Sequence, residues 1–314
     1  MQAYSGALAV RQRGVHMLSW QFGDVTVTRV EESAGPMFDP TTFFPDFDAD
    51  RFHAEAWMKP DFVSADGKMM ASMHTWVIRT PRHTVLIDSC VGDDKERLPF
   101  RDFHQLKSPW LANLEAAGVR PETVDYVLCT HLHVDHVGWN TRLQDGRWIP
   151  TFPNARYLFG RAEYAHWEHE RGVPNARGFA AMSQKVYDDS VLPVIQAGLV
   201  DLVGDDHELL DALLRIKLAP GHTPGSITID LTTPQRRALF TGDILHHPIQ
   251  VLLPEWNSAF CGAPEQARQT RRQVLEQCAE SKAVLMPAHF GRPHCGHVHR
   301  NGNTFAFAPV QPDR

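Results

Sequence analysis

The amino-acid sequence predicts a mixed α/β fold. Short runs of β-branched and apolar residues recur along its 314 residues, for example at 124–129, 214–219 and 283–286. Between them lie stretches in which apolar residues repeat at helical spacing, at 104–118 and 263–281. Four of the predicted strands lead directly into His or Asp beside Gly or Pro. Strands and helices thus alternate in one chain, and the candidate functional residues lie at strand ends.

The first half of the chain contains four predicted strands and one helix. Residues 1–20 carry no clear pattern, and we expect an arm that is flexible or serves as an oligomer contact. Residues 33–72 are rich in Pro, Asp, Phe and Gly, which predicts loops that either fold over a pocket or pack on the core. The regular elements expected are a strand at 22–30, a hairpin of strands at 74–78 and 84–87, a helix at 104–118 that ends at Gly118, and a strand at 124–129.

The second half repeats the succession of strand, loop and helix. A helix is expected to begin at Arg161 and to open a helical insertion at about 161–200, whose His166 and His169 we interpret as solvated. The other expected elements are strands at 152–159, 214–219, 237–240 and 283–286, a helix at 263–281 and a closing hairpin at 298–307 around Asn301-Gly302. We expect residues 21–314 to form a single domain.

Composition narrows the class of protein. Apolar residues make up 43% of the chain, enough for a sizeable core, and the net charge is −6. An acidic balance argues against a broad surface for nucleic acid or anionic membrane, and no apolar run is long enough for a membrane span. The first 20 residues lack the pattern of a secretory signal, so we expect a cytoplasmic protein. The five cysteines are irregularly spaced without a CxxC pair and are expected to be mostly buried free thiols.

A dense cluster of potential metal ligands follows the strand at 124–129. His131, His133, Asp135 and His136 occupy four of six consecutive positions, and Gly138 then helps the chain to bend. Imidazole nitrogens and carboxylate oxygens are the ligands that a borderline divalent ion such as zinc prefers. One metal takes about four ligands, so this loop begins two sites and completes neither. The missing ligands are therefore expected further along the chain.

Three later strands lead into such residues. His222 follows the strand at 214–219, Asp243 the strand at 237–240, and His289 the strand at 283–286. Each residue alone is weak evidence, because a single histidine is more often an ordinary loop residue and Asp243 is also a possible helix cap. Their shared position after strands favours one joint site, since ligands gathered at strand ends are held rigidly.

The order HxHxDH, GHTPGS, TGD and PAHF resembles the metallo-β-lactamase-fold hydrolases over most of the chain. The resemblance implies an αββα sandwich, two facing mixed sheets flanked by helices. It also implies a dinuclear centre of two divalent metal ions, with zinc expected first and Mn²⁺, Co²⁺ or Fe as alternatives. In it His131, His133 and His222 bind one metal, Asp135, His136 and His289 bind the other, and Asp243 bridges both. A hydroxide between the metals would attack the substrate.

Within that family the pattern is closest to methyl parathion hydrolases and acyl-homoserine lactonases, and Asp243 disfavours the true β-lactamases. This implies hydrolysis of a small, uncharged ester, lactone or organophosphate. Hydrolytic dehalogenation of aromatics, a mono-iron sulfur dioxygenase and a non-catalytic binding module are the alternatives. The lactonases carry a tyrosine three residues after the bridging Asp, where this chain has His246, followed by His247.

We interpret His246 as a candidate catalytic group beside Asp135 and Asp243, one that donates a hydrogen bond or a proton to the substrate. The alternative for His246 and His247 is support of the ligands or core packing. Trp139, Trp256, Phe290 and His247 are candidates for the pocket wall, whereas Trp110 is expected in the core. The expected partners are a small-molecule substrate and, because relatives are often homodimers, a second copy of the chain.

Overall fold

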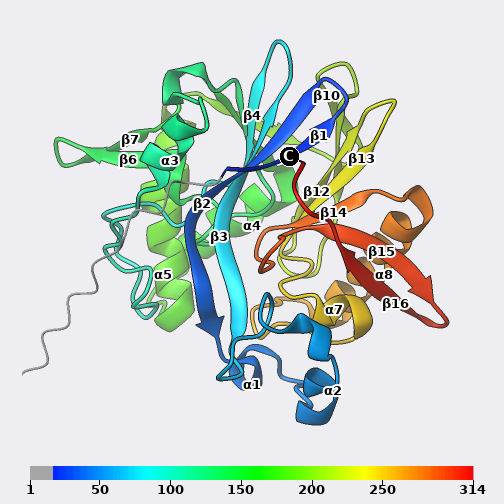
Figure 1. Ribbon diagram of the computed structural model, residues 1–314. Coiled ribbons are helices and arrows are strands. Elements are labelled where there is room, and N and C mark those ends of the chain that lie inside the picture. The colour runs from blue at the N-terminus through cyan, green and yellow to red at the C-terminus, as the bar shows by residue number, and fades with distance from the viewer. Residues whose placement is uncertain (1–16, 314) are drawn as a thin grey trace, which may run out of the picture.

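The computed structural model describes residues 17–313 and contains two large sheets that pack face to face (Figure 1). The first has the strand order β1-β2-β3-β4-β5-β8-β9, with parallel pairing from β4 through β9 and antiparallel pairing elsewhere. Its strands are β1 (Leu18–Phe22), β2 (Val25–Phe38), β3 (Met69–Arg79), β4 (Thr84–Ile87), β5 (Tyr126–Cys129), β8 (Arg156–Gly160) and β9 (Val200–Val203).

The second sheet has the order β10-β11-β12-β13-β14-β15-β16, and β13 and β14 are its parallel pair. Its strands are β10 (His207–Leu209), β11 (Leu214–Leu218), β12 (Ile227–Thr232), β13 (Arg237–Gly242), β14 (Val284–Pro287), β15 (Gly296–Asn301) and β16 (Thr304–Pro309). A small hairpin of β6 (Thr141–Gln144) and β7 (Arg147–Pro150) projects beside the first sheet (Figure 1).

Helices lie on the outer sides of the sheets (Figure 1). The first sheet packs against α3 (Trp110–Ala116), α4 (Arg161–Arg171), α5 (Gly178–Val186), η4 (Tyr187–Val191) and α6 (Leu192–Gln196). The second packs against α7 (Ile249–Leu252) and α8 (Pro264–Ser281). The short helices α1 (Pro40–Phe43) and α2 (Ala49–His53) lie beyond the lower ends of β2 and β3 in Figure 1 and contribute side chains to the same apolar cluster. Single turns occur at η1 (Ala56–Met58), η2 (Pro121–Thr123) and η3 (Gly138–Asn140). The predicted α/β sandwich of two facing mixed sheets is thus confirmed.

Alternation along the strands explains the layers. In β3 and β4, Trp76, Ile78 and Val85 face the core between the sheets, whereas Val77 and Leu86 face the helices. Successive residues of a strand point to opposite faces, so both faces of the sheet are buried by apolar side chains. The indole N–H of Trp76 donates to the carbonyl of Pro287 across the two sheets (3.1 Å), at the level where β14 ends. The sheets are therefore held together near the ends of their strands.

Several predicted boundaries were wrong. Residues 18–20, assigned to the arm, belong to β1, and the rest of that prediction lies outside the described residues apart from Met17. The helix expected at 104–118 begins only at Trp110, because the preceding residues form turns. The strand expected at 152–159 begins at Arg156. The loop prediction for 33–72 fails at its ends, where β2 continues to Phe38 and β3 starts at Met69.

Other predictions are confirmed. The hairpin of β3 and β4, the helix α8 and the closing hairpin at Asn301-Gly302 are present, and Trp110 is fully buried. The segment at 161–200 contains the helices α4, α5, η4 and α6, as expected; of its two histidines, His169 is exposed as predicted, whereas His166 is half-buried. All five cysteines are free thiols, four of them buried and Cys261 half-buried.

Candidate metal centre

Seven predicted ligands from four separate segments meet at one edge of the sandwich. The loop after β5 carries His131, His133, Asp135 and His136. The other three lie just beyond the ends of β11, β13 and β14: His222, Asp243 and His289. Six are buried and Asp135 is half-buried. The amide of Ile227 donates to the carbonyl of Thr130 (2.9 Å), so the two sheets are joined directly behind the ligands.

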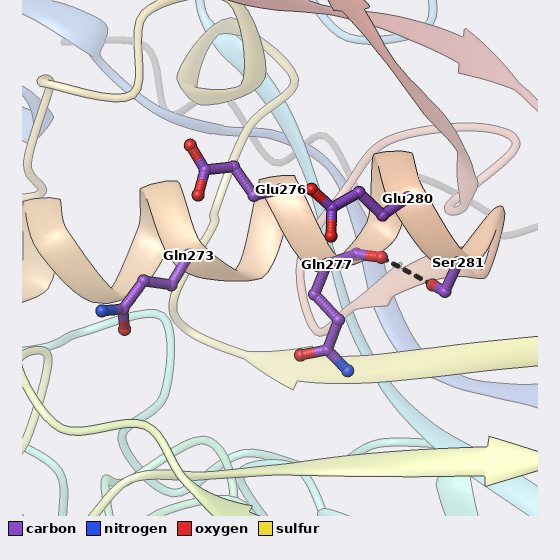
Figure 2. A pocket seen from close by; sticks show the side chains of 5 residues that line it. All are labelled: Gln273, Glu276, Gln277, Glu280 and Ser281. Atoms are coloured by element: carbon purple, nitrogen blue, oxygen red, sulfur yellow. Dashed lines mark hydrogen bonds between the residues drawn. The ribbon is translucent and has the colours of Figure 1, made fainter.

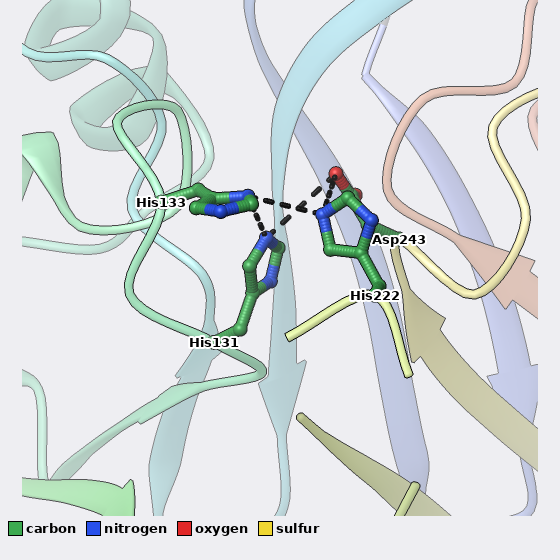
Figure 3. Close-up of side chains that lie close together, drawn as sticks. All are labelled: His131, His133, His222 and Asp243. Carbon is green, nitrogen blue, oxygen red and sulfur yellow. Dashed lines mark hydrogen bonds and ion pairs between the residues drawn. The ribbon is translucent and has the colours of Figure 1, made fainter. Parts of the chain in front are cut away.

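The first group of donors consists of His131, His133, His222 and Asp243 (Figure 3). His133 Nδ1 lies 3.0 Å from His131 Nε2 and 3.0 Å from His222 Nε2. Asp243 Oδ2 lies 3.4 Å from His222 Nε2 and 3.7 Å from His131 Nε2. We call these four residues the first donor set.

The second group consists of Asp135, His136 and His289. The Nε2 atoms of the two histidines are 3.3 Å apart, and the carboxylate of Asp135 lies 3.6 Å from each of them. Asp243 Oδ1 reaches the same two atoms, at 3.2 Å from His136 and 2.9 Å from His289. We call these three residues the second donor set. Asp243 therefore turns one oxygen toward each set.

These residues fit a pair of divalent metal ions. Within each set the donor atoms lie within 4.8 Å of one another. Imidazole lone pairs only about 3 Å apart repel one another unless a cation or a proton lies between them. Asp243 Oδ1 is buried, and its contacts at 2.9 and 3.2 Å are with the Nε2 atoms of His289 and His136, so a carboxylate oxygen is aimed at the second set. Nitrogen and carboxylate donors in this number are those that zinc prefers.

Burial and charge act differently on the two sets. Burial holds the pKa of His131 and His222 well below the ordinary value and lowers that of His133 to about 4, so these rings are neutral, as metal ligands must be. Burial also opposes the charged form of His136 and His289, but nearby carboxylates, above all Asp243, outweigh it and raise the pKa of both. The same negative potential attracts a metal cation, which would displace those protons.

Sequence reasoning missed the role of Asp88. This buried residue follows β4, and its Oδ2 accepts a hydrogen bond from His136 Nδ1 (2.8 Å). It also accepts from the amide and the hydroxyl of Thr130 (2.7 and 2.9 Å), and that hydroxyl lies 3.1 Å from His131 Nδ1. A carboxylate behind a ligating histidine fixes the ring's orientation and tautomer. Its position after a strand adjacent to β5 was a signal that could have identified it.

A cavity of about 600 Å³ opens onto both donor sets. Its apolar wall contains six phenylalanines from remote segments: Phe38, Phe43, Phe100, Phe103, Phe179 and Phe260. Phe100, Phe179 and Phe260 contact one another, with ring centroids 6.1 to 6.3 Å apart. Both alternatives for 33–72 hold in part, because Phe38 and Phe43 line the cavity whereas Phe44, Phe52 and Phe62 pack in the core.

His246 lines the cavity, and four other candidates do not. Its Nε2 lies 3.2 Å from Asp243 Oδ2, and its ring is stacked on that of His289. The prediction of a pocket wall is corrected for four residues that are buried elsewhere: Trp139, Trp256, Phe290 and His247.

Each of these four is committed to a different contact. Trp139 stacks on Trp110 and donates to Glu32, and His247 lies 2.9 Å from the carbonyl of Phe62. Trp256 packs on Phe44 and Phe47, and Phe290 packs on Phe62 and Phe307. Core packing thus turns these four side chains away from the cavity.

A second hollow lies on α8 and is lined by none of the metal ligands (Figure 2). It is lined by Gln273, Glu276, Gln277, Glu280 and Ser281. The hydroxyl of Ser281 donates to the carbonyl of Gln277 (2.6 Å), one turn earlier in the same helix. These side chains belong to the solvated side of an amphipathic helix, so the chemistry is assigned to the cavity at the donor sets.

The fold and the two donor sets define a metal-binding α/β sandwich protein. A family model described as the metallo-beta-lactamase superfamily matches residues 73–289, more than half of the chain. The chain therefore belongs to the metallo-beta-lactamase superfamily. Membership of this superfamily agrees with the expected class of a metal-dependent hydrolase.

Relatives and solved structures agree with this assignment. The chain is 27% identical over 149 residues to the N-acyl homoserine lactonase AttM of Azorhizobium caulinodans, which covers 47% of this chain and 49% of that protein. It is 26% identical over 120 residues to an N-acyl homoserine lactonase of a Bacillus species, which covers 38% of each chain. The matches thus span half or less of these curated relatives.

Two solved structures share the fold over nearly the whole chain. A hydrolase of the beta lactamase superfamily, AbOPH, has a TM-score of 0.79 at 23% identity and covers 96% of this chain and 100% of that one. AidC, described as a dizinc quorum-quenching lactonase in complex with its product, has a TM-score of 0.76 at 19% identity and covers 95% and 98%. In residues 17–313 no helix has the length and apolar character needed to cross a membrane.

Proposed function

We propose that this protein is a hydrolase that binds two divalent metal ions and cleaves a small, uncharged, partly apolar ester, lactone or organophosphate. One observation carries the proposal: two donor sets that share Asp243 face a cavity of about 600 Å³ with a largely aromatic wall. Zinc suits the donor atoms best, and Mn²⁺, Co²⁺ or Fe are alternatives for the same ligands.

Each donor set is proposed to hold one ion. His131, His133 and His222 would bind one and Asp135, His136 and His289 the other, with Asp243 shared, as its two oxygens suggest. When bound, the two cations would supply Lewis-acid chemistry, which polarises a substrate oxygen and makes water a nucleophile near neutral pH. The chain's own contribution is to keep the imidazoles of the first donor set neutral through burial and to orient His136 through Asp88.

His246 is proposed to contact the substrate. It is 4% exposed and faces the cavity; its Nε2 lies 3.2 Å from Asp243 Oδ2, and its Nδ1 has no hydrogen-bond partner among the described residues. A neutral imidazole carries one N–H, which can donate to the substrate's oxygen or to its leaving group. An unpartnered buried donor is costly, so a role toward a ligand accounts for its position better than packing alone.

The aromatic wall supports an apolar body for the substrate. The cavity is lined by Phe43, Phe179 and Phe260 close to the donor sets, and Phe179 packs 5.5 Å from the ring of His133. Such a wall excludes water from the reacting centre and contributes binding through apolar contact. The relatives named above act on acyl-homoserine lactones, and a lactone with an apolar tail meets the same description.

The alternatives receive less support. A mono-iron dioxygenase would use only some of the seven predicted ligands, and a degenerate binding module has no need for all seven to converge. Hydrolytic dehalogenation of an aromatic would use the same site and remains the second candidate, favoured by the phenylalanine wall. The cytoplasmic location and the homodimer stay predictions.

Metal analysis combined with a substrate panel tests the proposal. The purified protein is loaded with zinc, dialysed and analysed for metal, and then assayed against lactones, aryl esters, phosphotriesters and haloaromatics. We expect about two equivalents of metal per chain and turnover of at least one hydrolysable class. A protein that retains one iron, or that binds two zinc ions and hydrolyses no member of the panel, would contradict it.

A further inference from the structure

Glu163 is a buried carboxylate that none of the chemistry above uses. It lies in the first turn of α4 and is 1% exposed. Its oxygens accept four hydrogen bonds from side chains and backbone of three different segments. Burying a charge so completely is unfavourable unless every partner is in place. Such a residue therefore has a defined task in the fold.

The two oxygens of Glu163 hold two different loops. Oε1 accepts from the amide of Leu132 (3.0 Å), which lies between His131 and His133. Oε2 accepts from the amide of Gly225 (3.0 Å) and the hydroxyl of Thr223 (2.7 Å), both in the loop that carries His222. One carboxylate thus fastens two loops together. These loops supply the three histidines of the first donor set, which are drawn in Figure 3.

Close backbone contact makes this link rigid. A Cβ added to Gly225 would lie 2.0 Å from the amide nitrogen of Glu163, and one added to Gly160 would lie 2.7 Å from the carbonyl oxygen of Gly225. The start of α4 therefore packs directly against the loop after β11, with no side chain between them. The indole of Trp167 also donates to Oε1 (2.6 Å) and packs 5.4 Å from the ring of His133.

The second donor set is oriented by other groups. His136 Nδ1 donates to Asp88 (2.8 Å), and His289 Nδ1 donates to the carbonyl of Ser72 (3.2 Å). None of the four hydrogen bonds of Glu163 involves Asp135, His136 or His289. Glu163 thus makes its direct contacts beside the ligands of the first set, although the two sets share Asp243 and the loop at 131–136, and Asp88 also reaches His131 through the hydroxyl of Thr130.

We propose that Glu163 is a positioning residue for one metal ion only, and that it sets the affinity of the first donor set independently of the second. This role depends on the proposed two-metal function. Supporting groups behind metal ligands typically change metal affinity by 10- to 100-fold. Loss of the Glu163 contacts would let the two loops separate, so three histidines would have to be reassembled by the ion itself.

The substitution Glu163→Gln tests this role. The amide keeps the size of the side chain but turns an N–H₂ group toward donors, so at least one loop is released. In zinc titrations against a chromophoric chelator, we expect one equivalent to bind roughly 10- to 100-fold more weakly and the other to keep its affinity. The matched control is Glu168→Gln, an exposed position on the same helix, for which both equivalents should bind as in the unaltered protein.

A double substitution assigns the weakened ion. In a His133→Ala background the first set is already broken, so adding Glu163→Gln should not weaken the remaining ion further. In a His289→Ala background it should weaken the remaining ion by the same 10- to 100-fold factor. Equal loss in both backgrounds, or no loss in either, would overturn the assignment.

Two further measurements separate the possible failures. If the unaltered protein binds fewer than two equivalents, the proposed two-metal function fails, whatever Glu163 does. If it binds two and Glu163→Gln binds both unchanged, only the role of Glu163 fails. Should Glu163→Gln not fold, as judged by circular dichroism, Thr223→Val removes one of the four hydrogen bonds with little change in shape. That variant should weaken one equivalent several-fold, and unchanged affinity for both would overturn the role.

Discussion

Glu32 is a buried carboxylate behind the metal-ligand loop, and its ionisation should make the stability of the protein depend on pH. It is 4% exposed and accepts hydrogen bonds from the amides of Val91 and Gly92 and from the indole of Trp139. Burial raises the pKa of Glu32 to about 7, although these three donors oppose the rise. The ordinary value of 4.5 applies in the unfolded chain.

The sign and size of the effect follow from these two values. Between about pH 4.5 and pH 7 the folded protein holds a proton on Glu32 that the unfolded chain has lost, so stability falls as the pH rises. Above about pH 7 both states are ionised and the effect is constant. At about 1.4 kcal/mol for each pH unit, the full loss is about 3 kcal/mol, of which roughly 2.5 kcal/mol falls between about pH 5 and pH 8.

Chemical denaturation of the metal-free protein across this range, followed by tryptophan fluorescence, measures the effect. Glu32→Gln does not titrate, so the free energy of unfolding of the unaltered protein minus that of the variant should fall by roughly 2.5 kcal/mol from about pH 5 to pH 8. Other titrating groups cancel in this difference. An amide N–H₂ facing the donors destabilises the variant equally at every pH. A difference that is flat, or that grows with pH, would refute the reasoning.

The other predictions concern the site. His222→Ala should lose bound metal and lower kcat by at least roughly 10³-fold, whereas His169→Ala on the exposed side of α4 should do neither; metal analysis and kinetics decide this. A chelator should abolish turnover, and added Zn²⁺, Mn²⁺ or Co²⁺ should restore it, so activity that survives complete metal removal would exclude a metal mechanism. His246→Gln should keep both metal equivalents and lower kcat about 10²-fold, and an unchanged kcat would remove its proposed role. Phe179→Ala should raise KM about 10-fold with a smaller change in kcat, because apolar contact is lost away from the reacting bond.

The predicted ligands could be identified from the sequence because their signal is local. A dense cluster such as His131 to His136, directly after an apolar strand, rarely occurs away from a metal site, and His222, Asp243 and His289 repeat its position after strands. Hydrophobic periodicity likewise identified α8 and the hairpin of β15 and β16, because side-chain direction in a helix or strand follows the repeat of the backbone. These features depend on residues close together in the chain.

The supporting carboxylates and the cavity wall could not be identified in this way. In the sequence Glu163 resembles an ordinary residue of a solvated helix turn, and it is buried because the loops after β5 and β11 pack against it. Phe38, Phe179 and Phe260 come from segments that no local pattern connects, while Trp139 follows the metal loop directly and nevertheless packs in the core. Residue type and spacing therefore specified which residues form the two donor sets, and packing between distant segments specified which groups hold them and which line the cavity. The physical reason is that burial and partner choice depend on contacts between remote parts of the chain, which a linear pattern does not contain.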